Sequence, residues 1–213
     1  MHGARAGRLP AIGDDRRQFS REHTEMSRRR GSSPRPDPYA ISELGAAHVA
    51  ALCAHMRRHG AESGRGGDVI FRPRSADEEF DEAAAVERLR SSWARPLTEP
   101  LWLRTWGLVI GGDVLGHVDL HGGRLSAELH RATLGIGIER AARGKGHGRA
   151  LLETAIAWSR EQGLTWIDLA VFAHNLPARA LYEAVGFVQV GMTRDQFRVE
   201  GVSVDDVLMA LRL

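Results

Sequence analysis

A short, cationic and glycine-rich segment holds the residue types that could most directly do chemistry. Between Arg140 and Glu153 the chain reads RAARGKGHGRALLE, in which three glycines alternate with Lys145 and His147. Glycines let successive backbone N–H groups turn toward one anion, and the apolar helical pattern that follows places the positive end of a helix dipole beside the loop. The segment therefore predicts a site for a phosphate-bearing ligand at the start of a helix.

Two common phosphate-binding motifs do not fit this segment. The loop of nucleoside triphosphatases needs Ser or Thr directly after its lysine, but Gly146 follows Lys145. A dinucleotide-binding loop that starts at Gly144 needs a third glycine where Arg149 stands. A flexible turn without a ligand remains the alternative, and the basic side chains packed beside the glycines argue against it.

Hydrophobic periodicity predicts the elements that position the glycine loop. In the first half of the chain, strands are expected over 39–44, 101–110, 114–122 and 131–139, and helices over 46–60 and 75–94. Ser75 is expected to cap the second helix, whose first turn is acidic. Gly-Gly-Asp at 111–113 is expected to close a hairpin.

The second half continues from the glycine loop. Helices are expected over 147–163 and 175–186, and strands over 165–173, 187–193 and 203–213. Asn175 is the expected cap of the second of these helices. The order predicts a mixed α/β (α+β) domain over residues 37–213, with an antiparallel first half and a β-loop-α-β unit in the second.

These motifs resemble those of the GNAT N-acetyltransferases. The resemblance rests on Arg143-x-x-Gly146-x-Gly148 between a strand and a helix, preceded by GIGIE. It extends to His174–Asn175 after the next strand, to ALYEAVGF at 180–187 and to VDDVLMAL near the end of the chain. It covers residues 37–213 in the expected order, and it implies the GNAT fold, a central mixed sheet with a splayed acetyl-CoA cleft and flanking helices.

The resemblance implies acetyl-CoA as the acetyl-donor substrate. The backbone from Arg143 to Gly148 would surround the pyrophosphate, and the preceding strand would lie along the pantetheine arm. A backbone N–H of that strand would polarise the thioester carbonyl, and Asn175 would contact the arm besides capping its helix. The implied cofactor-binding residues are Ile136, Gly137, Ile138, Arg143, Gly144, Lys145, Gly146, His147, Gly148, Arg149 and Asn175.

In GNAT enzymes the amine attacks the thioester directly, so no protein nucleophile is required. Cys53, on the apolar face of a predicted helix, is therefore expected in the core. Tyr182 matches the position of the family's thiolate-protonating tyrosine, and packing is its alternative role. A non-catalytic module that binds or senses acyl-CoA is the alternative function, and a longer acyl donor is a further alternative.

The amine must also lose a proton to a general base. Strand alternation places His130 on one face with Ile136 and Ile138, and an imidazole titrates near neutral pH. His130 is therefore the first candidate, although similar enzymes that acetylate protein N-termini often carry a glutamate there. Asp119 is the second candidate and Glu128 the third, and a histidine bonded to backbone at the strand end is the alternative.

The acceptor is expected to be an amine, either a small molecule or a peptide N-terminus. A run of acids near its expected binding wall either forms a solvated helix face or attracts a cationic amine. This run consists of Asp77, Glu78, Glu79, Asp81, Glu82 and Glu87. Metal is not expected, because the spacing of His117, His121 and His130 fits no compact zinc pattern.

Charge divides the chain unevenly. Residues 1–36 hold nine arginines and four acids, a net charge of +5, whereas the whole chain carries +2, so the rest sums to −3. The basic tail lacks apolar periodicity and is expected to be disordered, and Met26 is an alternative start. The mildly acidic body gives no sign of a nucleic-acid surface.

Hydropathy and cysteine content bear on where the protein is located. No apolar stretch approaches the roughly 20 residues of a membrane-spanning helix. The single cysteine excludes an internal disulfide and suits a reducing compartment, so a cytoplasmic location is expected. A homodimer is compatible with the sequence.

Overall fold

The structure is a computed structural model that describes residues 39–75 and 77–213. The basic tail and its expected boundary with the domain lie outside the described residues, so both stay predictions. Within the described part, no helix is both long enough and apolar enough to cross a membrane.

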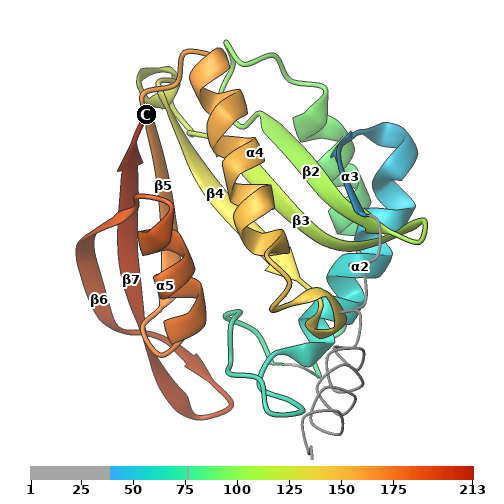
Figure 1. Cartoon of the computed structure of the whole chain (residues 1–213), viewed down its shortest axis with the longest axis vertical. Helices are drawn as coiled ribbons and strands as arrows, with labels where there is room; N and C mark the ends of the chain where they lie inside the picture. Colours follow the sequence, from blue (N-terminus) through green and yellow to red (C-terminus); the bar gives the residue numbers. More distant parts are fainter. Residues whose placement is uncertain (1–38, 76) are drawn as a thin grey trace, which may run out of the picture. The chain divides into compact units, whose positions relative to one another are not determined.

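A seven-stranded mixed sheet forms the centre of the domain, in the order β1-β2-β3-β4-β5-β7-β6 (Figure 1). Its strands are β1 (Tyr39–Leu44), β2 (Leu103–Ile110), β3 (Asp113–Gly122), β4 (Arg131–Ile138), β5 (Trp166–Phe172), β6 (Val188–Val199) and β7 (Val202–Arg212). Strands β1 to β4 pair antiparallel in chain order, and β4 pairs parallel with β5. This confirms the predicted mixed sheet with an antiparallel first half.

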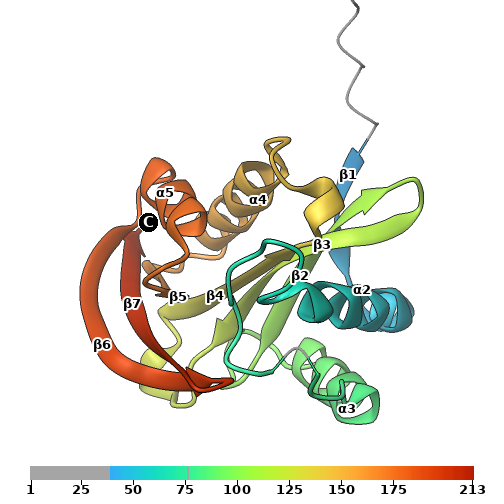
Figure 2. The ribbon, with the colours of Figure 1, turned by 90° about the horizontal axis from the view of Figure 1, so that it is seen from below.

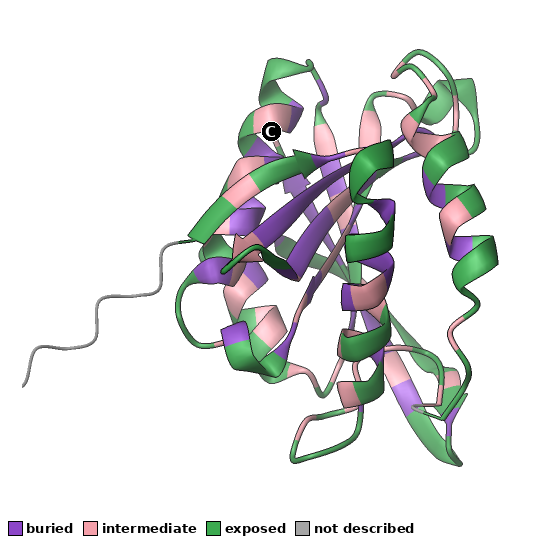
Figure 3. Ribbon diagram, turned by 90° about the vertical axis from the view of Figure 1, so that its right-hand side faces the viewer, coloured by how far each residue is buried: buried purple, intermediate pink, exposed green. Residues whose placement is uncertain are grey.

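Helices cover both faces of the sheet (Figure 2). One face carries α2 (Val49–Glu62) and α3 (Glu82–Trp93), and the other carries α4 (His147–Glu161) and α5 (Leu176–Ala184). Short 3-10 turns lie at η3 (Ala46–His48), η4 (Ser126–Glu128) and η5 (Arg140–Ala142). Burial is concentrated along the strands between the two helical layers (Figure 3).

Each helical layer buries an apolar stripe against the sheet. In α4, Leu151, Leu152 and Ala155 recur at helical spacing and have no exposed surface. In α2, Leu52 and Cys53 are equally buried and belong to a second cluster with α3. Burial raises the pKa of the Cys53 thiol. The expectation that Cys53 is a core residue is therefore confirmed.

The sheet divides between β4 and β5. Only Arg131–Thr133 and Trp166–Asp168 pair across this junction, although each strand continues for several residues. Beyond the paired segment, β4 stays bonded to β3 and β5 stays bonded to β7. The stretch Leu134–Ile138 therefore has no parallel neighbour, which is the splayed arrangement that the resemblance predicts.

Strand register assigns polar residues to the sheet face that α2 and α3 occupy. His117 lies opposite Gly137, Asp119 opposite Gly135, and His121 opposite Thr133. Thr133 in turn lies opposite Asp168 in β5. Opposed residues in paired strands project to the same side, so these seven residues form one surface, here called the polar face.

The second helix is shorter than the sequence predicts. It begins at Glu82 instead of 75, because Asp81 is its N-cap and accepts a hydrogen bond from the Ala84 N–H at 2.9 Å. The Ser75 hydroxyl instead donates to the Glu200 carboxylate at 2.6 Å, and it accepts from the Asp77 N–H at 3.3 Å. Ser75 and Asp81 are both good caps, and a tertiary contact decides between them.

Strand β6 is longer than the predicted 187–193. It continues to Val199 and returns into β7 through Glu200 and Gly201, whose φ values are 51° and 81°. Its register is irregular between Thr193 and Phe197. The segment is mostly exposed and polar, so it carries no clean alternation from which a strand could be predicted.

The capping assignment gives a stability prediction. Replacing Asp81 with Ala removes the acceptor for the Ala84 N–H and should lower the free energy of unfolding by about 1 kcal/mol. The matched control is Ser75→Ala, which removes an exposed hydroxyl outside the helix and should change stability by less than about 0.5 kcal/mol. Urea denaturation of both variants measures the difference. A larger loss for Ser75→Ala would contradict the observed helix start.

Candidate functional site

The glycine loop joins β4 to α4 with a backbone that only glycine adopts easily. Gly144 and Gly146 have φ values of 73° and 84°, and Gly146 is the N-cap of α4. Among the described residues, no acceptor bonds the N–H groups from Gly144 to Arg149, whereas the Ala150 N–H bonds the Gly146 carbonyl. The loop therefore presents unpaired donors at a helix N-terminus, as an anion site requires.

Gly148 has a different role, because it allows close packing. A Cβ at this position would lie 2.9 Å from Leu181 of α5 and 3.3 Å from Ile138 of β4. Ile136 and Ile138 are partly buried on the side of β4 that faces the α4 cluster. The small residue thus lets α4 approach the open segment of β4, where the pantetheine arm is expected.

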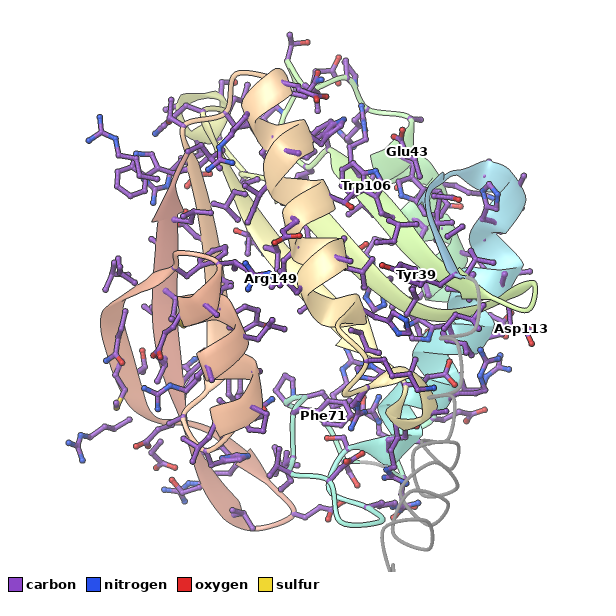
Figure 4. All side chains as sticks on the ribbon, in the orientation of Figure 1. Tyr39, Glu43, Phe71, Trp106, Asp113 and Arg149 are labelled. Atoms are coloured by element: carbon purple, nitrogen blue, oxygen red, sulfur yellow. The ribbon has the colours of Figure 1, made fainter. Side chains whose placement is uncertain are left out.

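The basic side chains of the loop differ in their partners. Arg143 is held by Glu62 at 2.6 Å and Asp68 at 2.8 Å, and its Nε donates to the Ile138 carbonyl at 2.7 Å. Its guanidinium also lies 5.3 Å from the ring centre of Phe71, on the segment between α2 and α3 (Figure 4). Arg143 therefore fastens this segment to the glycine loop, and it is not a free cation.

Of three further predicted cofactor residues, two have protein partners and one has none. Arg149 pairs with Glu153 one turn along α4 at 2.8 Å, and both side chains are more than half exposed. His147 is buried, and its Nδ1 lies 3.0 Å from the Ala142 carbonyl, so only its backbone faces the predicted phosphate site. Lys145 is exposed, and no ion pair joins it within the described residues. Lys145 and the unpaired N–H groups remain for a phosphate.

Asn175 is the N-cap of α5, and Tyr182 lies within this helix. The Asn175 Oδ1 accepts from the Ala178 N–H at 3.3 Å, which confirms the predicted cap. Tyr182 is buried, with its ring 6.0 Å from that of Phe187. Burial raises the pKa of the Tyr182 phenol, so it stays protonated at physiological pH.

The predicted base candidates are separated by the fold. His130 lies in the turn before β4, its side chain is exposed, and its backbone carbonyl accepts from the Thr165 N–H at 2.9 Å. Glu128 accepts from the N–H groups of Arg124 and Leu125 in the same connection. Only Asp119 lies on the polar face, where its Oδ1 accepts from the Thr105 hydroxyl at 2.6 Å.

Asp119 borders a group of histidines, of which only His117 and His121 were considered from the sequence, as metal ligands. The His55 ring is fully buried, 2.8 Å from Glu139 and 2.9 Å from His117. His59, one turn along α2, stacks on Phe71 with ring centres 4.6 Å apart. The spacing of His55 and His59 on one helical face was the available signal, but it did not reveal their distant partners.

Burial and charge set the protonation of this group. Burial and the neighbouring His117 lower the pKa of His55 to about 4, against the opposing effect of Glu139. Burial and His117 also lower that of His59, whose pKa falls to about 3. Burial alone would raise the pKa of Glu139, but hydrogen bonds from Arg58 and His55 outweigh it and lower the value. At neutral pH, His55 is therefore neutral and Glu139 is ionised.

A cavity of about 900 Å³ lies at the end of the sheet where β4 and β5 pair. Its walls include one side of α3, the connection between β3 and β4, and His121, Thr133 and Asp168 of the polar face. Asp168 is paired with Arg131 through two hydrogen bonds of 2.8 and 2.6 Å. The cavity therefore reaches the point where the two strands begin to separate.

The charges in this cavity differ from those that the sequence led us to expect. Of the acidic run, only Glu87 lines it, while Asp77 pairs with Arg65 and Glu78 with Arg74. Three arginines of the lining have no carboxylate within 4.0 Å among the described residues. They are Arg88, Arg95 and Arg124. The residues of the described chain also hold no cluster of three or more potential metal ligands.

The comparisons with known proteins agree with this geometry. The model of the Acetyltransferase (GNAT) family matches residues 71–187, which is more than half of the chain. The protein therefore belongs to the GNAT family of acetyltransferases. A GNAT acetyltransferase from Streptococcus pneumoniae has the same fold, with a TM-score of 0.69 and 23% identity over 83% of this chain and 100% of that one.

The matches to curated relatives cover little more than half of each relative's own length. N-alpha-acetyltransferase RimI of Mycobacterium tuberculosis is 32% identical over 91 residues, 43% of this chain and 56% of that protein. The ribosomal protein bS18 alanine N-acetyltransferase of Escherichia coli (strain K12) is 36% identical over 84 residues, 39% of this chain and 57% of that enzyme. The protein YncA of Salmonella typhimurium, solved with its cofactor acetyl-CoA, is 18% identical with a TM-score of 0.68 over 83% of this chain and 94% of that one. The chain is thus a member of a family of acetyltransferases.

The loop geometry yields a binding prediction. Gly146→Val should abolish detectable binding of acetyl-CoA in calorimetry and remove the thermal stabilisation that a ligand gives by mass action. The reasons are a β-branched residue at φ 84° and a bulky side chain beside the unpaired N–H groups.

The matched control is Gly111→Val in the hairpin between β2 and β3. Gly111 also has positive φ (61°) and open space around the missing Cβ, so backbone strain is similar there. This control should bind acetyl-CoA as the parent does. Normal binding by Gly146→Val would contradict the assignment of the loop.

Proposed function

We propose that the protein is an N-acetyltransferase that moves an acetyl group from acetyl-CoA to a primary amine by direct attack. The observation that carries the proposal is the divergence of β4 and β5 next to a glycine loop with unpaired N–H donors. Unpaired strand edges suit an extended amide-bearing arm, and a helix N-terminus suits a pyrophosphate. A cytoplasmic location is part of this proposal.

The donor substrate would be held by the residues that line this division. The N–H groups from Gly144 to Arg149 and the ammonium of Lys145 would bind the pyrophosphate, while Ile136, Gly137 and Ile138 would flank the arm. The side-chain amide of Asn175 keeps its N–H donors after Oδ1 caps α5, so it can bond a carbonyl of the arm. These residues are suited to coenzyme A by chemistry as well as by the family pattern.

In the proposed reaction, the amine nitrogen bonds to the thioester carbonyl carbon and the carbon–sulfur bond breaks. The amine loses its proton to a base, and the departing thiolate takes a proton from an acid. Tyr182 is the proposed acid. Its buried phenol remains protonated at physiological pH, and transfer to a thiolate needs a donor that has kept its proton.

The acid role of Tyr182 can be tested without disturbing the fold. Tyr182→Phe keeps the ring that packs against Phe187 and removes only the hydroxyl. It should lower kcat by about 10²-fold while acetyl-CoA binding stays unchanged. Steady-state thiol release and calorimetry measure the two quantities. An unchanged kcat would leave Tyr182 with a packing role alone.

The acceptor is proposed to be a small amine that also carries an anionic group, bound in the cavity beside α3. Arg88 lies on α3, Arg95 follows the end of that helix, and Arg124 comes from the connection between β3 and β4. The two other acids of the lining, Asp168 and Glu128, are already occupied by Arg131 and by backbone N–H groups. The unpaired charge in the cavity is therefore mostly positive, opposite to the cationic acceptor that the acidic run suggested.

An acceptor panel tests this charge argument. Thiol release from acetyl-CoA should be faster with amino acids and amino-sugar phosphates than with spermidine or a neutral arylalkylamine. Arg88→Gln together with Arg95→Gln should raise the KM of the preferred anionic amine about tenfold, because two favourable charges are lost. The control is Arg90→Gln, an exposed arginine of α3 outside the cavity lining. A preference for spermidine would restore the cationic hypothesis.

A non-catalytic acyl-CoA-binding module is the alternative function. It shares the donor site but needs neither the buried phenol nor the polar face. If acetyl-CoA binds and no amine of the panel releases thiol, the alternative is favoured and the catalytic proposal fails.

A further inference from the structure

A buried line of hydrogen-bonding groups runs from the molecular surface to the polar face. Arg58 donates to Glu139 at 2.9 Å, Glu139 lies 2.8 Å from His55 Nδ1, and His55 Nε2 lies 2.9 Å from His117 Nδ1. These residues come from α2, from β3 and from the end of β4. His117 is the member of this line on the polar face.

The hydrogen-bonding capacity of each group fixes the direction of the line. Glu139 is ionised and only accepts, so His55 must donate its Nδ1–H to it. Neutral His55 then carries no proton on Nε2, which must accept from His117 Nδ1–H. A neutral His117 with its proton on Nδ1 has a bare lone pair on Nε2.

That lone pair is close to the place where the reaction is proposed. His117 lies opposite Gly137 on the unpaired stretch of β4, and a Cβ on Gly137 would lie 2.8 Å from the His117 ring. The next polar-face position on β4, Gly135, has no atom within 4 Å of its missing Cβ. His117 Nε2 has no hydrogen-bond partner, and it is not among the sealed, unpaired atoms of the described residues. His117 itself is buried, with 9% of its surface exposed, and this nitrogen keeps part of that exposure.

We propose that His117 is the general base of the reaction, and that His55 and Glu139 are positioning residues that hold its Nδ1–H and leave Nε2 bare. The proposal rests on the proposed function, because it needs an amine at the β4–β5 division. His117 Nε2 takes the proton from the attacking amine nitrogen as the carbon–nitrogen bond forms.

Asp119 is the charged neighbour of His117 in this arrangement. Its Oδ2 lies 3.6 Å from His117 Nε2, while its Oδ1 is fixed by Thr105, which also accepts from Trp93 Nε1 at 3.1 Å. The carboxylate is therefore placed to stabilise the imidazolium that forms when His117 takes a proton. Asp119 acts through His117 in this scheme.

Titratable and charged groups pack around His117 from several elements. From α2 these are His55 and His59, and Arg58 through Glu139. Asp119 and, behind it, His121 lie on β3, and Arg143 of the glycine loop lies near His59. The two neighbouring histidines are neutral, so the negative charge of Asp119 is the nearest charge to His117 Nε2.

The tautomers can be tested without any acceptor. Long-range ¹H–¹⁵N NMR of the ¹⁵N-histidine-labelled full chain at pH 7 should show His117 and His55 protonated on Nδ1 and bare on Nε2. The resonances are assigned with His117→Gln and His55→Gln. Protonation of His117 on Nε2 would overturn the proposal, whatever amine the enzyme uses.

Kinetics test the role of the lone pair. With the best amine of the acceptor panel, His117→Gln should lower kcat/KM at pH 7 by about 10²-fold and remove the acidic limb of its pH profile. Asp119→Asn should lower kcat/KM at pH 7 by less than His117→Gln does, because it removes only the carboxylate that stabilises the imidazolium. His130→Gln tests the competing base candidate in the exposed turn before β4, and under this proposal it retains the parent profile.

The outcomes separate this proposal from the function on which it rests. If the parent protein releases no thiol with any amine, the proposed function fails while the tautomer measurement still stands. If the parent is active and His117→Gln keeps its acidic limb at the same midpoint, His117 is not the base. If His130→Gln loses the limb instead, the base belongs to the turn before β4.

Discussion

The separation of β4 from β5 is the constraint on which the rest of the structure depends. Three residue pairs hold the two strands together, and then each strand keeps only its other neighbour. A strand with an unpaired edge is costly unless a ligand or solvent satisfies its N–H and C=O groups. The open edges of the two strands therefore suit the extended, amide-bearing arm of the proposed donor. The glycine loop follows the unpaired end of β4, and the cavity beside α3 lies where β4 and β5 are paired.

Ion pairs between distant segments hold the walls of this division. Arg143 of the glycine loop binds Glu62 and Asp68, and Arg140 also binds Asp68. Burial would raise the pKa of Asp68, but hydrogen bonds from the two arginines outweigh it and keep the carboxylate ionised. A residue type that the family pattern assigns to phosphate charge is thus used in part to fix the loop between α2 and α3. The bound anion then relies more on backbone N–H groups and Lys145.

The polar face carries the groups on which the proposed proton transfer depends. Gly135 leaves open space over β4, whereas Gly137 gives room to the His117 ring. Asp119 and His117 lie opposite these glycines, and helix α2 supplies the buried partner of His117. Mixed polar groups inside a protein are costly unless every donor has an acceptor. Along the line from Arg58 to His117, each donor has an acceptor, and only His117 Nε2 lacks a hydrogen-bond partner. The atom left over is the one that the proposed chemistry uses.

The elements that could be predicted were those whose signals are local. The strand–glycine loop–helix unit, the cap at Asn175 and the buried stripe of α4 each depend on residues a few positions apart, and the structure contains them all. The start of α3 was predicted wrongly because two good caps, Ser75 and Asp81, compete within the same acidic segment. Ser75 instead bonds Glu200, which lies 125 positions further along the chain. Strand β6 was predicted too short because an exposed polar strand carries no alternation.

By itself, the sequence determined the family, the glycine loop and the identity of the proposed acid. It also placed Cys53 in the core, because the apolar face of one helix suffices for that conclusion. Only the tertiary structure pointed to His117 as the proposed base. His55 meets His117 across 62 positions and Glu139 across 84, and no periodicity or spacing encodes such a contact. Strand register and helix packing bring these groups within hydrogen-bonding distance, and hydrogen bonds at that distance fix which nitrogen keeps its lone pair.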